Sequence, residues 1–109
     1  MPSGIENYNR TQVNISALLE KLPVVTEVPL ICRNCYDGYR DALRYETIGP
    51  VNIRYAYELT AKVHEMGDVD VADDAVIVSF RGHAVADGVA IWRTNRDEYH
   101  AIVWYDHLD

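Results

Sequence analysis

Cys32 and Cys35 are separated by two residues, which is the spacing of paired zinc ligands and of redox dithiols. A zinc site would need further ligands, and the best pair available, His100 and His107, has six residues between its members. Zinc-binding histidine pairs usually have about three to five. A reactive dithiol would need Cys32 at the start of a helix. We keep Cys32 and Cys35 as candidates for a zinc or thiol site, with inert buried thiols as the simpler interpretation.

Cys35, His83 and Asp87 could form a set of nucleophile, base and orienting carboxylate. Gly82 precedes His83 at the end of a predicted strand, where a bulge would turn the histidine outward. Many other combinations of the same residue types are open to the chain, and nothing in the spacing selects this one. We therefore predict no catalytic residues and no cofactor, and expect a protein that binds rather than catalyses.

Acidic residues are concentrated in the second part of the chain. The 109 residues carry a net charge of −7; residues 1–60 hold six Lys/Arg and seven Asp/Glu, whereas residues 61–109 hold four and ten. A negative field repels the phosphates of nucleic acids and attracts basic surfaces. We expect a basic protein surface as the partner and no direct binding of nucleic acid, although solubility alone would also explain the charge.

Aromatic residues accompany these acids. Eight tyrosines and two tryptophans are more than one small core can hold, and both types are enriched at the centres of interfaces. Aromatic anchors surrounded by carboxylates near strand ends would suit a basic partner. The predicted partner-binding residues are Asp73, Asp74, Asp87, Trp92, Asp97, Glu98, Tyr99 and Asp106.

Three segments have the pattern of helices. Apolar residues recur at helical spacing in Thr11–Leu22, where Thr11 or Asn14 can serve as the cap. Asn34–Tyr45 begins with a capping residue, and Pro50–Met66 has proline at its first position and glycine after its end. These helices precede the segments that resemble strands.

The second half alternates apolar and polar residues as the strands of a meander do. The predicted strands are Ala75–Arg81, Val89–Arg93 and Tyr99–Tyr105, joined by turns at Asp87-Gly88 and Asn95–Asp97. Val24–Cys32 is also extended, at an edge because Pro29 lacks a donor, and Val69 and Val71 could start a short strand in the acidic connection Gly67–Asp74. On the last strand, Tyr99, Ala101, Val103 and Tyr105 should face one side, and His100, Ile102, Trp104 and Asp106 the other.

Helices followed by a meander predict one α+β domain over residues 1–109, with a three- or four-stranded antiparallel sheet and two or three helices on one face. Disorder is expected only in residues 1–9. No apolar run suits a membrane helix and no secretory signal is present, so we expect a cytoplasmic protein. The predicted core is Leu18, Leu22, Leu43, Leu59, Val63, Val78, Phe80, Ile91 and Val103.

The function that we predict is a small acidic binding or inhibitor module that covers a basic surface, such as that of a nuclease or another nucleic-acid-binding protein. Size, charge and architecture are analogous to those of phage-encoded anti-defence proteins and bacterial immunity proteins, with no motif in common. In the phage case, the protein would act inside the host cell.

Two alternatives and one assembly stay open. The order of Asn34–Tyr45, a turn at Glu46–Gly49, Pro50–Met66 and the meander resembles the layout of a winged-helix DNA-binding regulator, with Arg54 and Lys62 toward DNA. The zinc or thiol protein at Cys32 and Cys35 is the other alternative. A homodimer would form if an edge strand were uncovered, with Val24–Cys32 and Tyr99–Tyr105 as the candidates.

Overall fold

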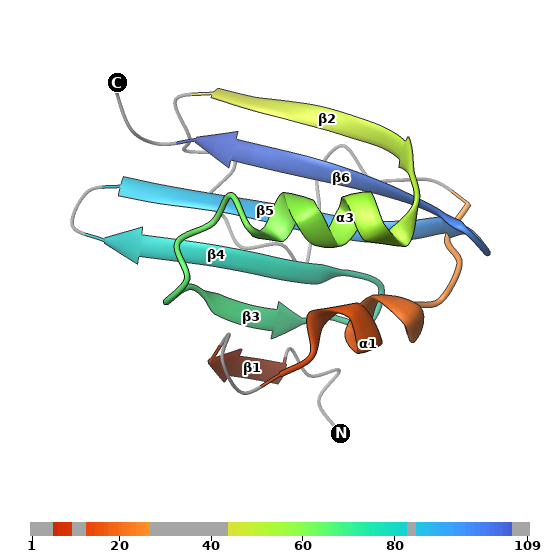
Figure 1. Cartoon of the computed structure of the whole chain (residues 1–109), viewed down its shortest axis with the longest axis horizontal. Helices are drawn as coiled ribbons and strands as arrows, with labels where there is room; N and C mark the ends of the chain where they lie inside the picture. The colour runs from red at the N-terminus through yellow and green to blue at the C-terminus, as the bar shows by residue number, and fades with distance from the viewer. Residues whose placement is uncertain (1–5, 10–12, 27–43, 83–84, 106–109) are drawn as a thin grey trace.

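The computed structural model describes residues 6–9, 13–26, 44–82 and 85–105. In chain order its elements are β1 (Glu6–Asn9), α1 (Ile15–Glu20), β2 (Arg44–Val51), α3 (Ile53–Thr60), β3 (Asp68–Val71), β4 (Val76–Gly82), β5 (Val85–Asn95) and β6 (Glu98–Tyr105). The strands form one sheet in the order β1-β3-β4-β5-β6-β2, and every neighbouring pair is antiparallel. Both described helices lie on the same face of this sheet (Figure 1).

The α+β class and the antiparallel meander are confirmed, while the sheet is wider than predicted. The strands β1, β2 and β3 were not among the three strands predicted for the meander. Of these, β3 matches the short strand that the alternation at Val69 and Val71 suggests. β1 occupies residues for which disorder was expected, and it pairs with β3. With six strands among the described residues, the sheet exceeds the three or four that we predicted.

Asparagine caps begin both described helices, and each helix is shorter than its sequence pattern. The Asn14 side chain accepts the Ala17 N–H at 3.2 Å, and the Asn52 side chain accepts the Tyr55 N–H at 2.8 Å. Just beyond Thr60 the backbone N–H groups donate to the carbonyl three residues earlier instead of four, as Val63 does to Thr60 at 3.2 Å. The α-helix therefore ends at Thr60.

The segment Arg44–Val51 corrects two predictions. Arg44 and Tyr45, placed at the end of a helix, are the first residues of β2, and the rest of that predicted helix lies outside the described residues. Pro50, predicted as the first residue of the next helix, still belongs to β2 and follows a cis peptide bond from Gly49. The strand forms because Arg44–Ile48 pair in register with Tyr105–Ala101 of β6, a contact between residues distant in sequence.

Asp87 and Gly88 do not form a turn, because both lie within β5. Asp87 is paired with Phe80 and Gly88 with Ser79 of β4, and Gly88 also lies opposite Trp104 of β6. A Cβ atom on Gly88 would collide with the ring of Trp104. The chain therefore needs glycine at this position so that the Trp104 indole ring can approach the backbone closely, and not to form a turn. The second predicted turn is confirmed in its position, since β5 ends at Asn95 and β6 begins at Glu98.

The two faces of the sheet carry separate apolar clusters. The cluster under α1 and α3 includes Leu19, Leu59, Val78, Ile91, Tyr99 and Val103, and the opposite face holds Ala75, Ile77, Ala90, Trp92, Ile102 and Trp104. The predicted alternation of β6 is thereby confirmed over the described residues. Of the predicted core, Leu22, Leu59, Val63, Val78, Ile91 and Val103 are buried, Leu18 and Phe80 are half-buried, and Leu43 lies outside the described residues.

Candidate functional site

Two acidic turns lie at the same end of the sheet. Asp73 and Asp74 form the turn between β3 and β4, and Asp97 and Glu98 lie where β5 turns into β6. The register of β4, β5 and β6 puts both turns at the same end, on the right of Figure 1, with two strand spacings, about 10 Å, between them across the sheet. The β5–β6 turn extends further along the strands, because β4 begins opposite Ile91 whereas β5 continues to Asn95. Val24 pairs with Arg93 in this stretch of β5 beyond β4. We call Asp73, Asp74, Asp97 and Glu98 the acidic end.

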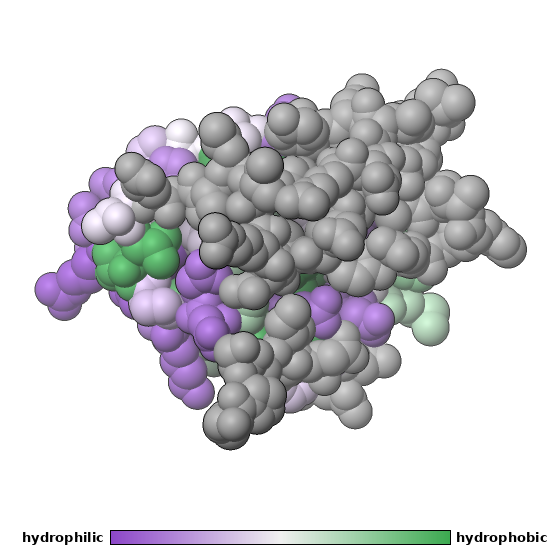
Figure 2. Space-filling view, turned by 180° about the vertical axis from the view of Figure 1, so that it is seen from behind, coloured by the Kyte–Doolittle hydropathy of each residue, from purple (hydrophilic) through white to green (hydrophobic). Residues whose placement is uncertain are grey.

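The carboxylates of the acidic end differ in exposure. Asp73, Asp97 and Glu98 are exposed, whereas Asp74 is half-buried and one of its carboxylate oxygens is enclosed. Seen from behind, hydrophilic residues lie around a hydrophobic patch at the left of the molecule, which is this same end of the sheet (Figure 2). Of the four residues of the acidic end, these three exposed side chains are the ones that a partner could reach.

A hydrogen bond from a backbone N–H helps to set the shape of each turn. The Ala72 N–H donates to the Ala75 carbonyl at 2.9 Å and closes a two-residue connection over Asp73 and Asp74. In the other turn, the Asn95 side-chain oxygen accepts the Arg96 N–H at 2.7 Å. Asparagine and aspartate favour such turns because their side chains bond the nearby backbone.

Arg93 ties helix α1 to the β5–β6 turn. Its Nη1 donates to the carbonyls of Glu20 at 2.9 Å and Leu22 at 3.4 Å, while its Nε donates to the Arg96 carbonyl at 3.0 Å. The Arg93 carbonyl in turn accepts the Val25 N–H at 2.8 Å. This arginine uses its donors on backbone carbonyls, so it fixes the β5–β6 turn in position relative to α1.

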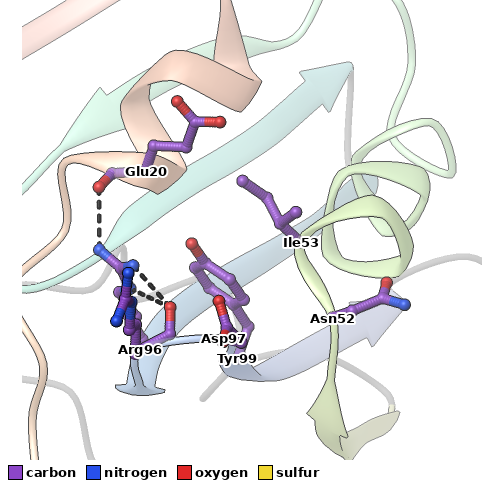
Figure 3. Close-up of a pocket in the computed structure, with 7 residues that line it drawn as sticks. Glu20, Asn52, Ile53, Arg96, Asp97 and Tyr99 are labelled. Atoms are coloured by element: carbon purple, nitrogen blue, oxygen red, sulfur yellow. Dashed lines mark hydrogen bonds between the residues drawn. The ribbon is translucent and has the colours of Figure 1, made fainter.

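A groove of about 440 Å³ lies beside the acidic end, between the end of α1, the start of α3 and the β5–β6 turn (Figure 3). The Glu20 carboxylate points away from its own backbone carbonyl, which accepts a hydrogen bond from Arg93. The residues that line the groove are Glu20, Asn52, Ile53, Arg93, Arg96, Asp97 and Tyr99.

Tyr99 forms the inner wall of this groove and is 2% exposed. Its hydroxyl donates to the Leu19 carbonyl at 3.2 Å. Burial raises the pKa of the Tyr99 phenol, Arg93 opposes this effect, and Glu20 and Asp97 add to it. The phenol is thus held protonated as a structural donor, and the groove lining contains neither a thiol nor an imidazole that could act as nucleophile or base.

The predicted aromatic anchors are corrected by their burial. Trp92 is 0% exposed and lies in the cluster on the face opposite the helices, and Tyr99 lies in the cluster beneath the helices. Neither ring is available to a partner, because alternation along β5 and β6 directs each into an apolar cluster. Tyr55 and Tyr57 of α3 are exposed instead, at 47% and 45%.

Asp87, another predicted site residue, does not belong to the acidic end. Asp87 lies on the far part of β5, opposite Phe80, and is half-buried. Asp106, Cys32, Cys35 and His83 lie outside the described residues. No group of three or more possible metal ligands occurs in the described part of the chain.

The winged-helix layout is wrong for this chain. Its turn at Glu46–Gly49 is part of β2, and that strand continues to Val51 before α3 begins. Lys62 falls after the end of α3, in a turn. A helix–turn–helix therefore does not occur at this place, since a paired strand separates α3 from what precedes it.

Comparisons with protein-family models, with curated proteins and with solved structures found no match for this chain. Among the described helices, none is both long and apolar enough to cross a membrane.

Sequence reasoning identified the acidic residues but not their grouping. Asp73 and Glu98 are far apart in the chain, and only the register of three strands brings their turns together. It missed the groove residues Glu20, Asn52 and Arg93 altogether. The position of Asn52 could have been predicted as a helix cap, since asparagine is a typical cap before an amphipathic segment.

Proposed function

We propose that the chain is a non-catalytic binding module that inhibits a protein partner by covering a basic surface with its acidic end. The observation that carries this proposal is that two acidic turns lie at the same end of the sheet, with Asp73, Asp97 and Glu98 exposed. Arg93 fixes the backbone of one of them, the β5–β6 turn. Charges held in place on a rigid framework lose little entropy on binding and steer a charged partner toward the site.

Surfaces that bind nucleic acid are strongly basic, because they neutralise phosphates with lysine and arginine. A partner of that class, such as a nuclease or another nucleic-acid-binding protein, would be blocked when carboxylates occupy the positions of its phosphates. The chain would then act inside a cell, as an anti-defence or immunity-type protein. The net charge of −7 supports this choice because it repels nucleic acid itself.

Capture from a lysate of the native host, followed by mass spectrometry, tests the proposal. The test variant combines Asp73→Asn, Asp97→Asn and Glu98→Gln. The control removes the same number of charges from exposed acids elsewhere, through Glu58→Gln, Glu65→Gln and Asp68→Asn. We expect the wild type and the control to retain a basic partner that the test variant loses.

Binding kinetics with the captured partner complete the test. Association of the test variant should be at least about tenfold slower than that of the control at low salt, and the difference should shrink as salt screens the charges. Equal association by the test and control variants would disprove the assignment to the acidic end. Capture of nucleic acid in place of a protein would disprove the partner class.

A further inference from the structure

An exposed apolar side chain lies among the carboxylates of the acidic end. Val24 is 56% exposed and Val25 is half-buried, and Figure 2 shows a hydrophobic patch within hydrophilic residues at this end of the sheet. The other large apolar side chains that are exposed in the described residues lie on α3 or in the connection that follows it, and they are Tyr55, Tyr57 and Met66. Single exposed apolar residues are common on protein surfaces, so it is the position of Val24 that gives it meaning.

The register places Val24 between the two acidic turns. Arg93 of β5 is paired with β6 on one side, so its bridge to Val24 lies on the other side, toward β4. β4 begins opposite Ile91, two residues before Arg93, and the turn over Asp73 and Asp74 precedes it. Across the sheet, Val24 therefore has that turn on one side and the β5–β6 turn on the other.

The backbone on both sides of Val24 is held by Arg93. The Arg93 guanidinium donates to the Leu22 carbonyl at 3.4 Å, and the Arg93 carbonyl accepts the Val25 N–H at 2.8 Å. The Val25 side chain packs against the apolar cluster on the face opposite the helices. A partner can therefore cover Val24 without the entropy cost of ordering a loop, whereas the anchors predicted from the sequence, Trp92 and Tyr99, are buried.

We propose that Val24 is the apolar centre of the binding surface, and that the basic partner presents an aromatic side chain to it with arginine or lysine around that side chain. Resting on the proposed function, this assignment adds the contact that the carboxylates surround. Protein interfaces have an apolar core within a polar rim, and a few central residues supply most of the binding energy. The carboxylates would steer the partner to the surface, and Val24 would slow its release.

Charge decides against a second copy of the chain as the occupant. Two acidic ends in contact would bring the exposed carboxylates of both copies together, and like charges across an interface repel. The strand Tyr99–Tyr105, which the sequence offered as an edge for a dimer, is not an edge, because β6 is flanked by β5 and β2. The other candidate edge, Val24–Cys32, is paired with β5 at Val24, and its residues after Thr26 lie outside the described residues.

Two synthetic peptides of equal charge test the assignment by titration calorimetry at low salt. Both carry six arginines, and the middle position is tryptophan in one and alanine in the other. Wild type should bind the tryptophan peptide at least about fivefold more tightly, because that peptide alone covers Val24 with a large ring. Val24→Thr, which makes half of the exposed side chain polar, should reduce this preference to about twofold or less. Val24→Leu should keep it.

Two controls separate the apolar contact from the charges. Met66→Thr removes an exposed apolar side chain elsewhere and should keep the wild-type preference. The combined variant Asp73→Asn, Asp97→Asn and Glu98→Gln should weaken both peptides alike, because it removes charge and leaves Val24 in place. Circular dichroism should show that all variants are folded.

The outcomes distinguish this inference from the proposed function. Equal affinities of wild type for the two peptides, or a full preference in Val24→Thr, would overturn the role of Val24 while the loss of affinity in the charge variant still supported the acidic end. A charge variant that binds both peptides as tightly as wild type would overturn the proposed function itself. A dimer in sedimentation velocity that Val24→Thr abolishes would assign Val24 to a second copy and overturn the partner proposed here.

Discussion

The two ends of the sheet are built by different means. At the acidic end, an arginine binds backbone carbonyls of α1 and of the β5–β6 turn, and the carboxylates project from this framework. Toward the other end, Gly88 and Trp104 are in such close contact that no added carbon fits between them. The comparison teaches that surface charge can be removed from the first end without loss of the fold, whereas the second end tolerates no added volume.

The largest effect is expected at the Gly88–Trp104 contact. Gly88→Ala should lower the free energy of unfolding by about 3 kcal/mol, because the new methyl group collides with a fully buried ring. Urea unfolding measures the change. Trp104→Phe in the same chain makes room, so the double variant should lose less than the sum of the two single losses. Strict additivity would show that the ring contact is not the cause.

Loss of the arginine at the acidic end should have the next largest effect. Arg93→Ala should cost about 2 kcal/mol, because it removes several charge-assisted hydrogen bonds to the carbonyls of Glu20, Leu22 and Arg96. Hydrogen exchange should show that the Val25 amide loses protection first, since it donates to the backbone of the same residue. Arg96→Ala is the matched control, because the bond is to the Arg96 backbone. Equal losses in both variants would contradict the role of the guanidinium.

The Tyr99 phenol should make stability fall at alkaline pH. The pKa of the phenol is raised in the folded chain above the ordinary value of 10.0, so its stabilising contribution is complete below pH 10 and is lost as the pH rises through the folded pKa. Tyr99→Phe should cost about 1 kcal/mol at neutral pH through the lost bond to Leu19, and should reduce the alkaline loss. Unfolding curves from pH 8 to 11, about one unit and more either side of this value, measure both. If the unfolding free energy of Tyr99→Phe fell with pH as steeply as that of the wild type, the assignment of this loss to the Tyr99 phenol would be contradicted.

Neutralising the acidic end should have the smallest effect on folding. The combined variant of Asp73→Asn, Asp97→Asn and Glu98→Gln should change the unfolding free energy by less than about 0.5 kcal/mol per substitution, since these side chains are exposed. Thermal unfolding measures this. A loss of several kcal/mol would show that the carboxylates hold the turns together, and the contrast between the two ends would then fail.

The sequence predicted best the elements whose patterns are local. A few neighbouring residues determine each of three features that the sequence predicts: the alternation of β6, the position of the β5–β6 turn and the Asn14 cap. β2 could not be read, because its pairing with β6 is made with residues far along the chain. Gly88 was taken as a turn signal, since a glycine required by a distant ring looks the same in sequence.

The candidate site was predicted only as a set of charges. Alternation indicated which face Trp92 would take, but it could not show that this face is buried. The location of Asp73 and Glu98 at the same end of the sheet depends on the register of three strands, which no local pattern specifies. The opposite fate of Asp87, which pairs within the sheet at its other end, follows from the same register.

The most direct test of the central claim is a map of where a basic ligand touches the chain. Backbone amide chemical shifts would be recorded while a hexa-arginine peptide is added at low salt. The largest changes should fall on Asp73, Asp74, Asp97 and Glu98, and they should fade as salt is raised. Changes centred on Asp68 and Asp87, or spread evenly over the acidic residues, would contradict a binding surface at the acidic end.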